Sequence, residues 1–180
     1  SFFQQIGPFK RYLKDAQGTV IDSVFYQKGE PVKHYLKAEP RLMMRYTLNK
    51  NSSLKASYTQ NYQYMQIISL ANQSLPTDLW FPATSRVQPQ FGEQYSLGYY
   101  RNFKENTWET SVETYYKQMK NQVEFSDGTL PTSGFGENMD YQLTFGKGWA
   151  YGFEFFVKKA LGKTTGWIGY TLSWTVRKFP

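Results

Sequence analysis

The stretch from Gln94 to Met119 alternates between apolar and polar side chains with a period of two. In its second arm, one set of alternate positions holds aromatic, aliphatic or threonine residues: Trp108, Thr110, Val112, Thr114 and Tyr116. The positions between them are mostly charged or polar: Glu109, Ser111, Glu113, Tyr115 and Lys117. Because successive side chains of a β-strand point to opposite faces, the pattern predicts a strand with one apolar and one charged face.

The first arm of this stretch follows the same rule. Its apolar positions are Tyr95, Leu97, Tyr99 and Phe103. A polar turn at residues 104–106 separates the two arms and is short enough to join antiparallel neighbours directly. The whole stretch is therefore predicted to be a long amphipathic hairpin.

Two other segments repeat this hairpin pattern. Residues 41–64 contain a polar turn at 50–53, and residues 149–177 contain a turn near 162–165. The predicted strands, at about 10 to 13 residues, exceed the usual length and suffice for the ~9 to 11 residues that cross a bilayer at a tilt. Residues 41–180 are therefore predicted to be a transmembrane barrel segment.

Long connections separate these hairpins, at residues 65–93 and 120–148. Short turns that alternate with long connections are typical of outer-membrane β-barrels, in which the short turns are periplasmic and the long loops extracellular. Residues 1–40 are broken by prolines and glycines, and we predict an extracellular loop region there. A small hairpin within it is expected to pair residues 19–27 with residues 32–37.

The composition fits a transmembrane β-barrel better than a soluble core. Aromatic residues make up 19% of the chain, while the mean hydropathy is −0.62. Barrels produce this combination because only alternate residues face lipid and aromatic girdles line both interfaces. The net charge is +7, but the basic residues are scattered without a Lys/Arg block, which does not favour nucleic-acid binding. No run of about 18 apolar residues is present, so no transmembrane helix is predicted.

The predicted fold class is all-β, with antiparallel amphipathic hairpins that form part of a transmembrane β-barrel. The expected number of strands, about six, is below the eight of the smallest bacterial barrels, which indicates an interior piece of a larger one. Two positions break the apolar face. Arg101 lies near a short turn, where an interface with water is expected and a charge costs little. Gln60 lies in the middle of its predicted strand and has no such explanation.

Three stretches carry a resemblance to a known family. They are EPRLMMRYTLNKNSSLKASYTQNYQYMQ (39–66), PQFGEQYSLGYYRNFKENTWETSVETYYKQMKNQVEF (89–125) and YGFEFFVKKALGKTTGWIGYTLSWTVRKF (151–179). The chain resembles TonB-dependent outer-membrane receptors of the Bacteroidetes type over roughly residues 36–177, in the order of its hairpins and turns. The resemblance implies a barrel of about 22 strands that encloses a plug, of which this chain is an interior fragment.

The resemblance also implies a function and a location. Such a receptor lies in the bacterial outer membrane and imports a scarce solute, such as a siderophore or a glycan, into the periplasm. Its implied partners are outer-membrane lipids, TonB and the plug domain, and a surface lipoprotein is left open as a further partner. Two alternatives stand beside this reading: a small passive porin or adhesin barrel, and a soluble β-sheet module that binds polysaccharide.

The sequence offers little support for an enzyme, a cofactor or a metal centre. His34 is the single histidine and no cysteine is present, which excludes multi-histidine motifs and zinc bound through cysteine. No G-x-S-x-G elbow accompanies His34, so we expect no catalytic triad. The glycine pairs at 134/136 and 146/148 do not complete a dinucleotide-binding motif and are assigned to loops. Neither a catalytic residue nor a cofactor is predicted.

Two sets of residues are candidates for function. The first is a set of charges on the polar strand faces, interpreted as cross-strand ion pairs on a lumen wall that contacts the plug. Its members are Glu109, Glu113, Glu154, Lys117 and Lys158. A hydrolase with paired carboxylates is the less favoured reading of the same residues. The second set consists of candidate ligand contacts in and below a long connection: Trp80, Phe81, Arg86, Tyr62 and Tyr64. Simple packing of the loop is the favoured alternative for these aromatic residues.

Overall fold

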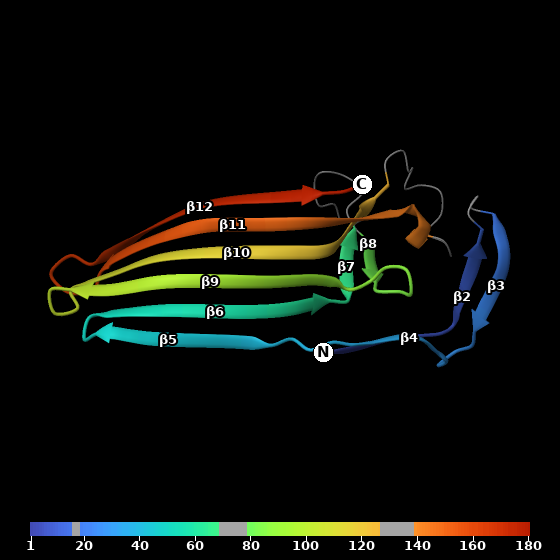
Figure 1. The fold of residues 1–180 in the computed structure, drawn as a ribbon, viewed down its shortest axis with the longest axis horizontal. Helices are drawn as coiled ribbons and strands as arrows, with labels where there is room; N and C mark the ends of the chain where they lie inside the picture. The colour runs from blue at the N-terminus through green and yellow to red at the C-terminus, as the bar shows by residue number, and fades with distance from the viewer. Residues whose placement is uncertain (16–18, 69–78, 127–138) are drawn as a thin grey trace.

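The computed structural model describes residues 1–15, 19–68, 79–126 and 139–180 of the chain. Its main feature is a six-stranded antiparallel sheet in the order β12-β11-β10-β9-β6-β5. The strands, side by side in Figure 1, are β5 (Arg41–Asn49), β6 (Ser52–Gln63), β9 (Gln90–Phe103), β10 (Trp108–Phe125), β11 (Leu143–Lys159) and β12 (Gly166–Lys178). The predicted all-β fold of antiparallel hairpins is thus confirmed, in a sheet that is not closed.

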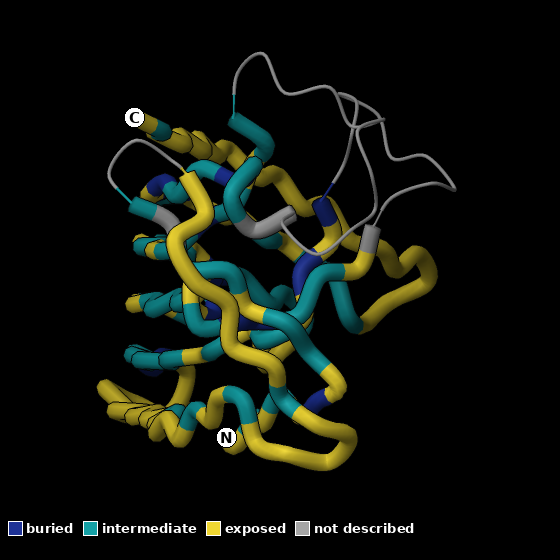
Figure 2. The backbone as a smooth tube through the Cα atoms, turned by 90° about the vertical axis from the view of Figure 1, so that its right-hand side faces the viewer, coloured by how far each residue is buried: buried dark blue, intermediate teal, exposed yellow. Residues whose placement is uncertain are grey.

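The register of this sheet aligns the apolar faces of all six strands. A central row that crosses them consists of Tyr46, Leu54, Tyr99, Val112, Phe155 and Tyr170. This face is not covered by protein, since Val112 is 44% exposed and Tyr116 is 45% exposed. In the tube of Figure 2, only short stretches are buried. Soluble proteins rarely expose an apolar surface this continuous, so the face needs a nonaqueous environment.

The turn between β9 and β10 forms where the sequence predicts it. The Thr107 amide donates to the Lys104 carbonyl at 3.0 Å. Both central residues, Glu105 and Asn106, have positive φ angles of 56° and 67°. Turns of this kind match the right-handed twist of the flanking strands, so the hairpin closes without splaying them.

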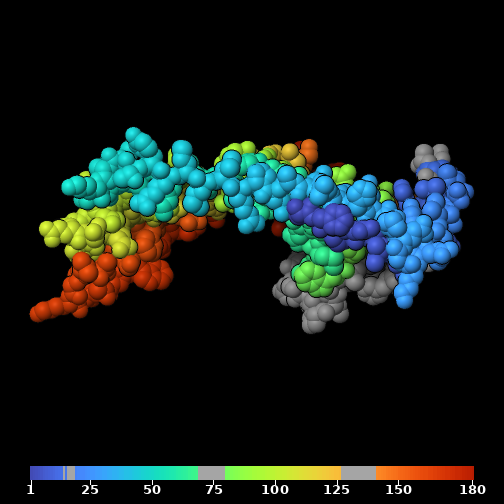
Figure 3. All heavy atoms as spheres, turned by 90° about the horizontal axis from the view of Figure 1, so that it is seen from below, coloured from blue at the N-terminus to red at the C-terminus, as the bar shows by residue number. Residues whose placement is uncertain are grey.

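Residues 1–15 and 19–36 form a bent ribbon made of β1 (Phe2–Ile6), β2 (Phe9–Lys14), β3 (Val20–Tyr26) and β4 (Pro31–Leu36). Figure 3 shows this ribbon, in blue, at the end of the elongated molecule opposite the short turns. β1 pairs with β4 and β2 pairs with β3. The predicted pairing of residues 19–27 with 32–37 is therefore wrong.

Gly29, which lies between the two segments that the sequence was expected to pair, instead marks a corner in the ribbon. The Gly7 amide donates to the Glu30 carbonyl at 2.8 Å, and the Gly29 amide donates to the Gly7 carbonyl at 3.1 Å. Gly29 has a φ of 84°, and a Cβ added to Gly7 would clash with the Gln27 carbonyl oxygen. The two glycines allow both sides of the ribbon to bend at one level, so a strong turn signal occurs without a chain reversal.

The strands reach further into the long connections than the sequence pattern indicates. Gly146 and Gly148 lie within β11, opposite Gln122 and Met119, and are not loop glycines. A bulge at Asn121, whose φ is 57°, shifts the register of β10 and interrupts the period-two pattern there. The other glycine pair, at 134 and 136, lies outside the described residues.

A small apolar cluster lies at the long-connection end. β7 (Met65–Ile68) and β8 (Leu79–Pro82) form a two-stranded ribbon there, and β7 crosses the direction of the main strands in Figure 1. Ile68, Val87 and Leu143 are buried in this cluster, and Phe81 packs against it. The cluster fixes the β7–β8 ribbon on the extended ends of β10 and β11. In the described residues, no helix is long and apolar enough to cross a membrane.

Candidate functional site

The polar face of the sheet carries the predicted charged residues. The register places Glu109, Glu113, Glu154, Lys117 and Lys158 together on the face opposite the exposed apolar rows. A groove of about 420 Å³ runs across it at the short-turn end. Its polar lining comes from Tyr100, Asn102, Glu109, Ser111, Glu113 and Glu154.

The five charged residues are arranged in different ways. Lys158 Nζ lies 3.2 Å from Glu109 Oε2, and both side chains remain about two-fifths exposed, at 43% and 39%. Such a pair contributes little stability because water screens it. Glu113 and Glu154 instead face each other directly across β10 and β11, while Lys117 lies opposite Ala150. Two adjacent carboxylates repel, so this part of the wall favours a cationic neighbour.

A tyrosine connects the acidic part of this face with a basic part. Lys55 Nζ lies 4.0 Å from the centre of the Tyr100 ring, which is a cation–π distance. The ring lies close to Gly98, since a Cβ added there would be 2.9 Å from Tyr100 Cε2 and 3.0 Å from Glu113 Cγ. Lys55 and Arg45 belong to the same row as Glu113 and Glu154. The row therefore changes from basic at β5 and β6 to acidic at β10 and β11.

A ladder of glutamines lies at the other end of the polar face and was not singled out from the sequence. Gln122 Nε2 donates to Gln90 Oε1 at 3.4 Å, and Gln90 Nε2 donates to Gln66 Oε1 at 3.3 Å. The ladder adjoins a second groove of about 420 Å³ that Lys117 and Arg177 also line. All three glutamines fall in or at the predicted long connections, where the strand period gives no signal. The number of glutamines in the long connections is the one feature of the sequence that could have indicated the ladder.

The predicted ligand contacts are distributed over several environments. Trp80 lies on β8 opposite Ile67 and is 61% exposed. Phe81 is partly buried against the apolar cluster. The guanidinium of Arg86 lies 4.5 Å from the Tyr141 ring centre. Trp80 and Arg86 are therefore exposed, whereas Phe81 is partly buried.

The two tyrosines of this set pack on other neighbours. Tyr62 is 5.1 Å from Phe91, centre to centre, at the end of β6. Tyr64 stacks on Phe3 at 5.2 Å, and its hydroxyl lies 2.7 Å from Ser1 Oγ. Tyr64 therefore connects the chain's first residues to the end of β6, whereas Tyr62 packs on Phe91 of β9.

The apolar face has a defined height along the strands. One aromatic row consists of Tyr58, Tyr95, Tyr116, Tyr151 and Trp174. At the other end, Phe103 and Trp108 are paired. The eight residue-to-residue steps from Trp108 to Tyr116 span about 27 Å along a strand, or about 20 Å at the tilt that barrel strands adopt.

This height explains the polar position that the sequence pattern left open. Gln60 lies one row beyond the tyrosines, opposite Glu93, which in turn lies opposite Gln118. The three form a polar stretch beyond the apolar band on β6, β9 and β10, and the row continues with Trp149 and Val176 on β11 and β12. Arg101 lies near the other boundary, with its guanidinium 4.7 Å from the Phe103 ring centre.

In the described residues, no group of three or more His, Asp or Glu side chains is arranged to hold a metal ion. A family model described as "TonB dependent receptor-like, beta-barrel" matches residues 14–180. No curated protein and no solved structure matches the chain. The match covers the bent ribbon from β3 onwards and every strand of the main sheet.

Proposed function

The chain belongs to the TonB-dependent receptor β-barrel family, and from this premise we propose that it forms wall and extracellular connections of a receptor that imports a scarce solute. The family consists of receptors and transporters of the outer membrane rather than enzymes. The solute, a siderophore, a glycan or a molecule of similar scarcity, enters the periplasm through the interior of the complete barrel.

The observation that supports this proposal most strongly is the separation of the two faces in register across all six strands. The exposed apolar band, with aromatic rows at both ends, suits the hydrocarbon layer and its interfaces. The opposite face carries charges, amides and grooves and suits a water-filled interior. A soluble polysaccharide-binding module would need the Val112 row inside a core, yet that row is exposed.

The orientation follows from the lengths of the connections. The short turns after β5, β9 and β11 face the periplasm, because periplasmic turns are short in these barrels. The bent ribbon, the β7–β8 ribbon and the glutamine ladder then lie on the extracellular side. There, Trp80 and its neighbours are positioned to meet a solute before it enters the barrel.

The acidic end of the interior wall suits a protein partner. We assign Glu113 and Glu154 to contact with basic side chains of the plug, because two facing carboxylates on adjacent strands are stabilised by a cation between them. In this assignment the Glu109–Lys158 pair borders the contact.

Energised import can be tested in cells that carry the intact receptor. Growth is measured on a panel of ferric chelates and oligosaccharides, each as the sole source of iron or carbon. Deleting the receptor gene should abolish growth on one member of the panel, and deleting TonB should abolish growth on the same member. Growth that needs the receptor but not TonB would indicate a passive pore and contradict the proposal.

A further inference from the structure

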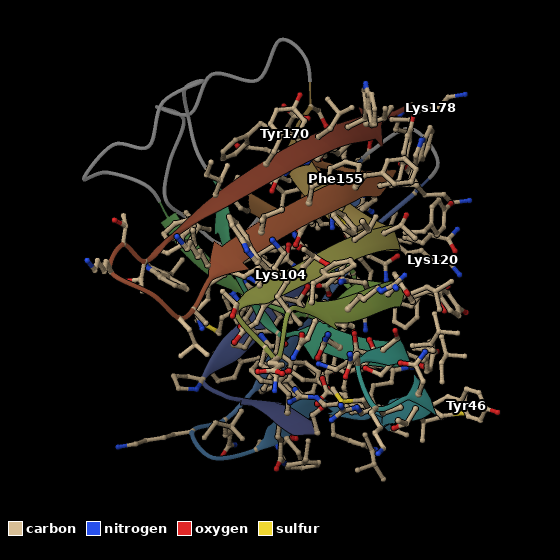
Figure 4. The ribbon with its side chains drawn as sticks, turned by 90° about the vertical axis from the view of Figure 1, so that its left-hand side faces the viewer. Tyr46, Lys104, Lys120, Phe155, Tyr170 and Lys178 are labelled. Carbon is tan, nitrogen blue, oxygen red and sulfur yellow. The ribbon has the colours of Figure 1, made fainter. Side chains whose placement is uncertain are left out.

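Three lysines lie side by side on the apolar face of the sheet, at its extracellular end. Lys120 is directly opposite Lys147, and Lys147 is directly opposite Lys178. All three side chains are exposed. Figure 4 shows Lys120 and Lys178 on the same side of the sheet as Tyr46, a residue of the central apolar row.

The same row continues with aromatic residues on the next two strands. Phe91 lies opposite Lys120, whose Nζ is 5.3 Å from the ring centre, and Tyr62 lies opposite Phe91. Lys37 Nζ lies 5.6 Å from the Tyr62 ring centre. We call this row the lysine strip: Lys37, Tyr62, Phe91, Lys120, Lys147 and Lys178.

The strip lies at a definite height above the apolar band. Lys120 is four residues beyond Tyr116, which corresponds to about 13 Å along the strand and about 10 Å along the membrane normal. Tyr116 belongs to the aromatic row that marks the interface. The strip is therefore at the level of lipid headgroups in the outer leaflet, on the surface that faces lipid rather than the interior.

The charges of the strip are not neutralised within the part of the chain that the structure describes. No described carboxylate is within salt-bridge distance of Lys120, Lys147 or Lys178. Glu93, one row below, accepts hydrogen bonds from Tyr58 and Tyr95, each at 3.5 Å. Like charges directly opposite each other on neighbouring strands are destabilising, so an anion that bridges the lysines would stabilise this region.

We propose that the lysine strip binds the phosphorylated headgroup of an outer-leaflet lipid. Lysine ammonium groups are good point-charge ligands for phosphate, and strips of basic residues beside a membrane recognise anionic headgroups. Phe91 and Tyr62 extend the row with amphipathic rings that suit the level between headgroup and hydrocarbon. The inference depends on the proposed location in the outer membrane, and it adds a lipid site on the outside of the barrel.

The test uses the intact receptor, purified in detergent, with diphosphoryl lipid A, dephosphorylated lipid A and inorganic phosphate as separate probes. Binding is measured by native mass spectrometry and by the shift in the temperature of unfolding. The triple variant K120Q/K147Q/K178Q removes the three charges. Its matched control, K50Q/K104Q/K163Q, removes three lysine charges from the short turns at the opposite end.

Wild-type receptor and control variant should bind diphosphoryl lipid A equally, and the triple variant should bind it about 100-fold more weakly, as the loss of three near-surface charges predicts. Wild-type receptor should bind dephosphorylated lipid A only weakly, with an affinity similar to that of the triple variant for diphosphoryl lipid A. Equal affinity of wild type and triple variant would overturn the proposal. Equal affinity for the two lipid forms, or tight binding of inorganic phosphate alone, would also overturn it.

These outcomes are independent of transport. A receptor that imports its solute but fails the lipid titration would contradict the lysine strip alone. A receptor that passes the titration but needs no TonB would contradict energised import and leave the lipid site standing.

Discussion

Because Gly98 has no side chain, two neighbouring side chains can occupy the space beside it. The Tyr100 ring and the Glu113 side chain occupy the space that a Cβ would need, at 2.9 and 3.0 Å. Lys55 is held above the same ring. The contact between the basic and acidic parts of the polar face therefore depends on a glycine in the middle of β9.

Replacing Gly98 by alanine should displace Tyr100 and destabilise the intact receptor by about 1–3 kcal/mol, the usual penalty for overpacking. The measurement is the temperature at which the folded band is lost on an unheated detergent gel. Gly92→Ala is the matched control on the same strand and face, because its nearest neighbour, Lys117 Cε, would be 3.7 Å from the new Cβ. Equal stability of the two variants would contradict the packing described for Tyr100.

A charge placed in the central apolar row should impair membrane assembly. Val112→Arg puts a guanidinium near mid-bilayer, at a cost of about 2–4 kcal/mol. Thr171→Arg adds the same group on the opposite face of the sheet, opposite Glu154, and should be tolerated. The amount of folded receptor in outer-membrane fractions measures both effects. Similar amounts of the two variants would argue against the assignment of the faces.

The direction of individual strand side chains could be predicted from the sequence, but their partners could not. Period two places Glu113 and Glu154 on one face without revealing that they oppose each other, since that depends on register. The same limit applies to Gln60. Its place outside the apolar band became evident only from its alignment with Glu93 and Gln118.

At the scale of elements, a tyrosine hydroxyl connects the bent ribbon to the segment after β8. Tyr35, on β4, donates a hydrogen bond from its hydroxyl to the Thr84 carbonyl at 2.5 Å. Burial raises the pKa of Tyr35 above its ordinary value, because the charged phenolate is poorly solvated there. The contact joins two segments at the long-connection end of the sheet that are far apart in sequence.

Tyr35→Phe should reduce the stability of the intact receptor by about 0.5–1.5 kcal/mol at neutral pH, the usual net value of such a hydrogen bond. The raised pKa means that the folded state favours the neutral phenol. The contribution of Tyr35 to stability is fully present below its pKa in the unfolded state, about 10. It is lost as the pH rises through the pKa of Tyr35 in the folded state. The unfolding temperatures of wild type and variant are measured at pH 8 and again above pH 10. The difference between the two proteins should be smaller at the higher pH. A constant difference would refute the assigned role.

Element boundaries were predictable where the period is uninterrupted and failed where a local irregularity hides it. The hairpin around Glu105 formed as predicted because its turn is short and both arms keep the period of two, with Arg101 as the exception near the turn. The bulge at Asn121 concealed the outer parts of β10 and β11. The pairing within residues 1–36 failed because Gly29 signals a reversal that the chain does not make.

At the scale of the molecule, the sheet is a curved wall that leaves the backbone edges of β5 and β12 unpaired. Hydrocarbon cannot satisfy those edges, so a lipid-facing sheet of this kind is stable only within a closed barrel. The family and the two-faced wall could be predicted because every strand repeats one rule. The proposed solute-binding surface could not, because it is built from connections whose packing depends on contacts between distant segments, such as those in the cluster of Ile68, Val87 and Leu143.

Trp80 is the residue on this surface at which solute uptake can be examined most directly. Its side chain is 61% exposed on β8, while the neighbouring Phe81 is partly buried against the apolar cluster. Trp80→Ala should therefore leave the fold intact and remove a ring available for stacking on a solute. The loss of one well-placed aromatic contact corresponds to about a tenfold rise in the solute concentration for half-maximal uptake.

The matched control is Trp167→Ala, which removes an equally large ring that is 71% exposed near the short turns. Uptake of the growth-supporting solute is measured in cells with equal amounts of each receptor variant in the outer membrane. In the proposed orientation the short turns face the periplasm and lie away from solute capture, so the Trp167 variant should behave as wild type. If Trp80→Ala leaves the half-maximal concentration unchanged, the exposed tryptophan is not a ligand contact, and solute capture must depend on other residues of the extracellular surface.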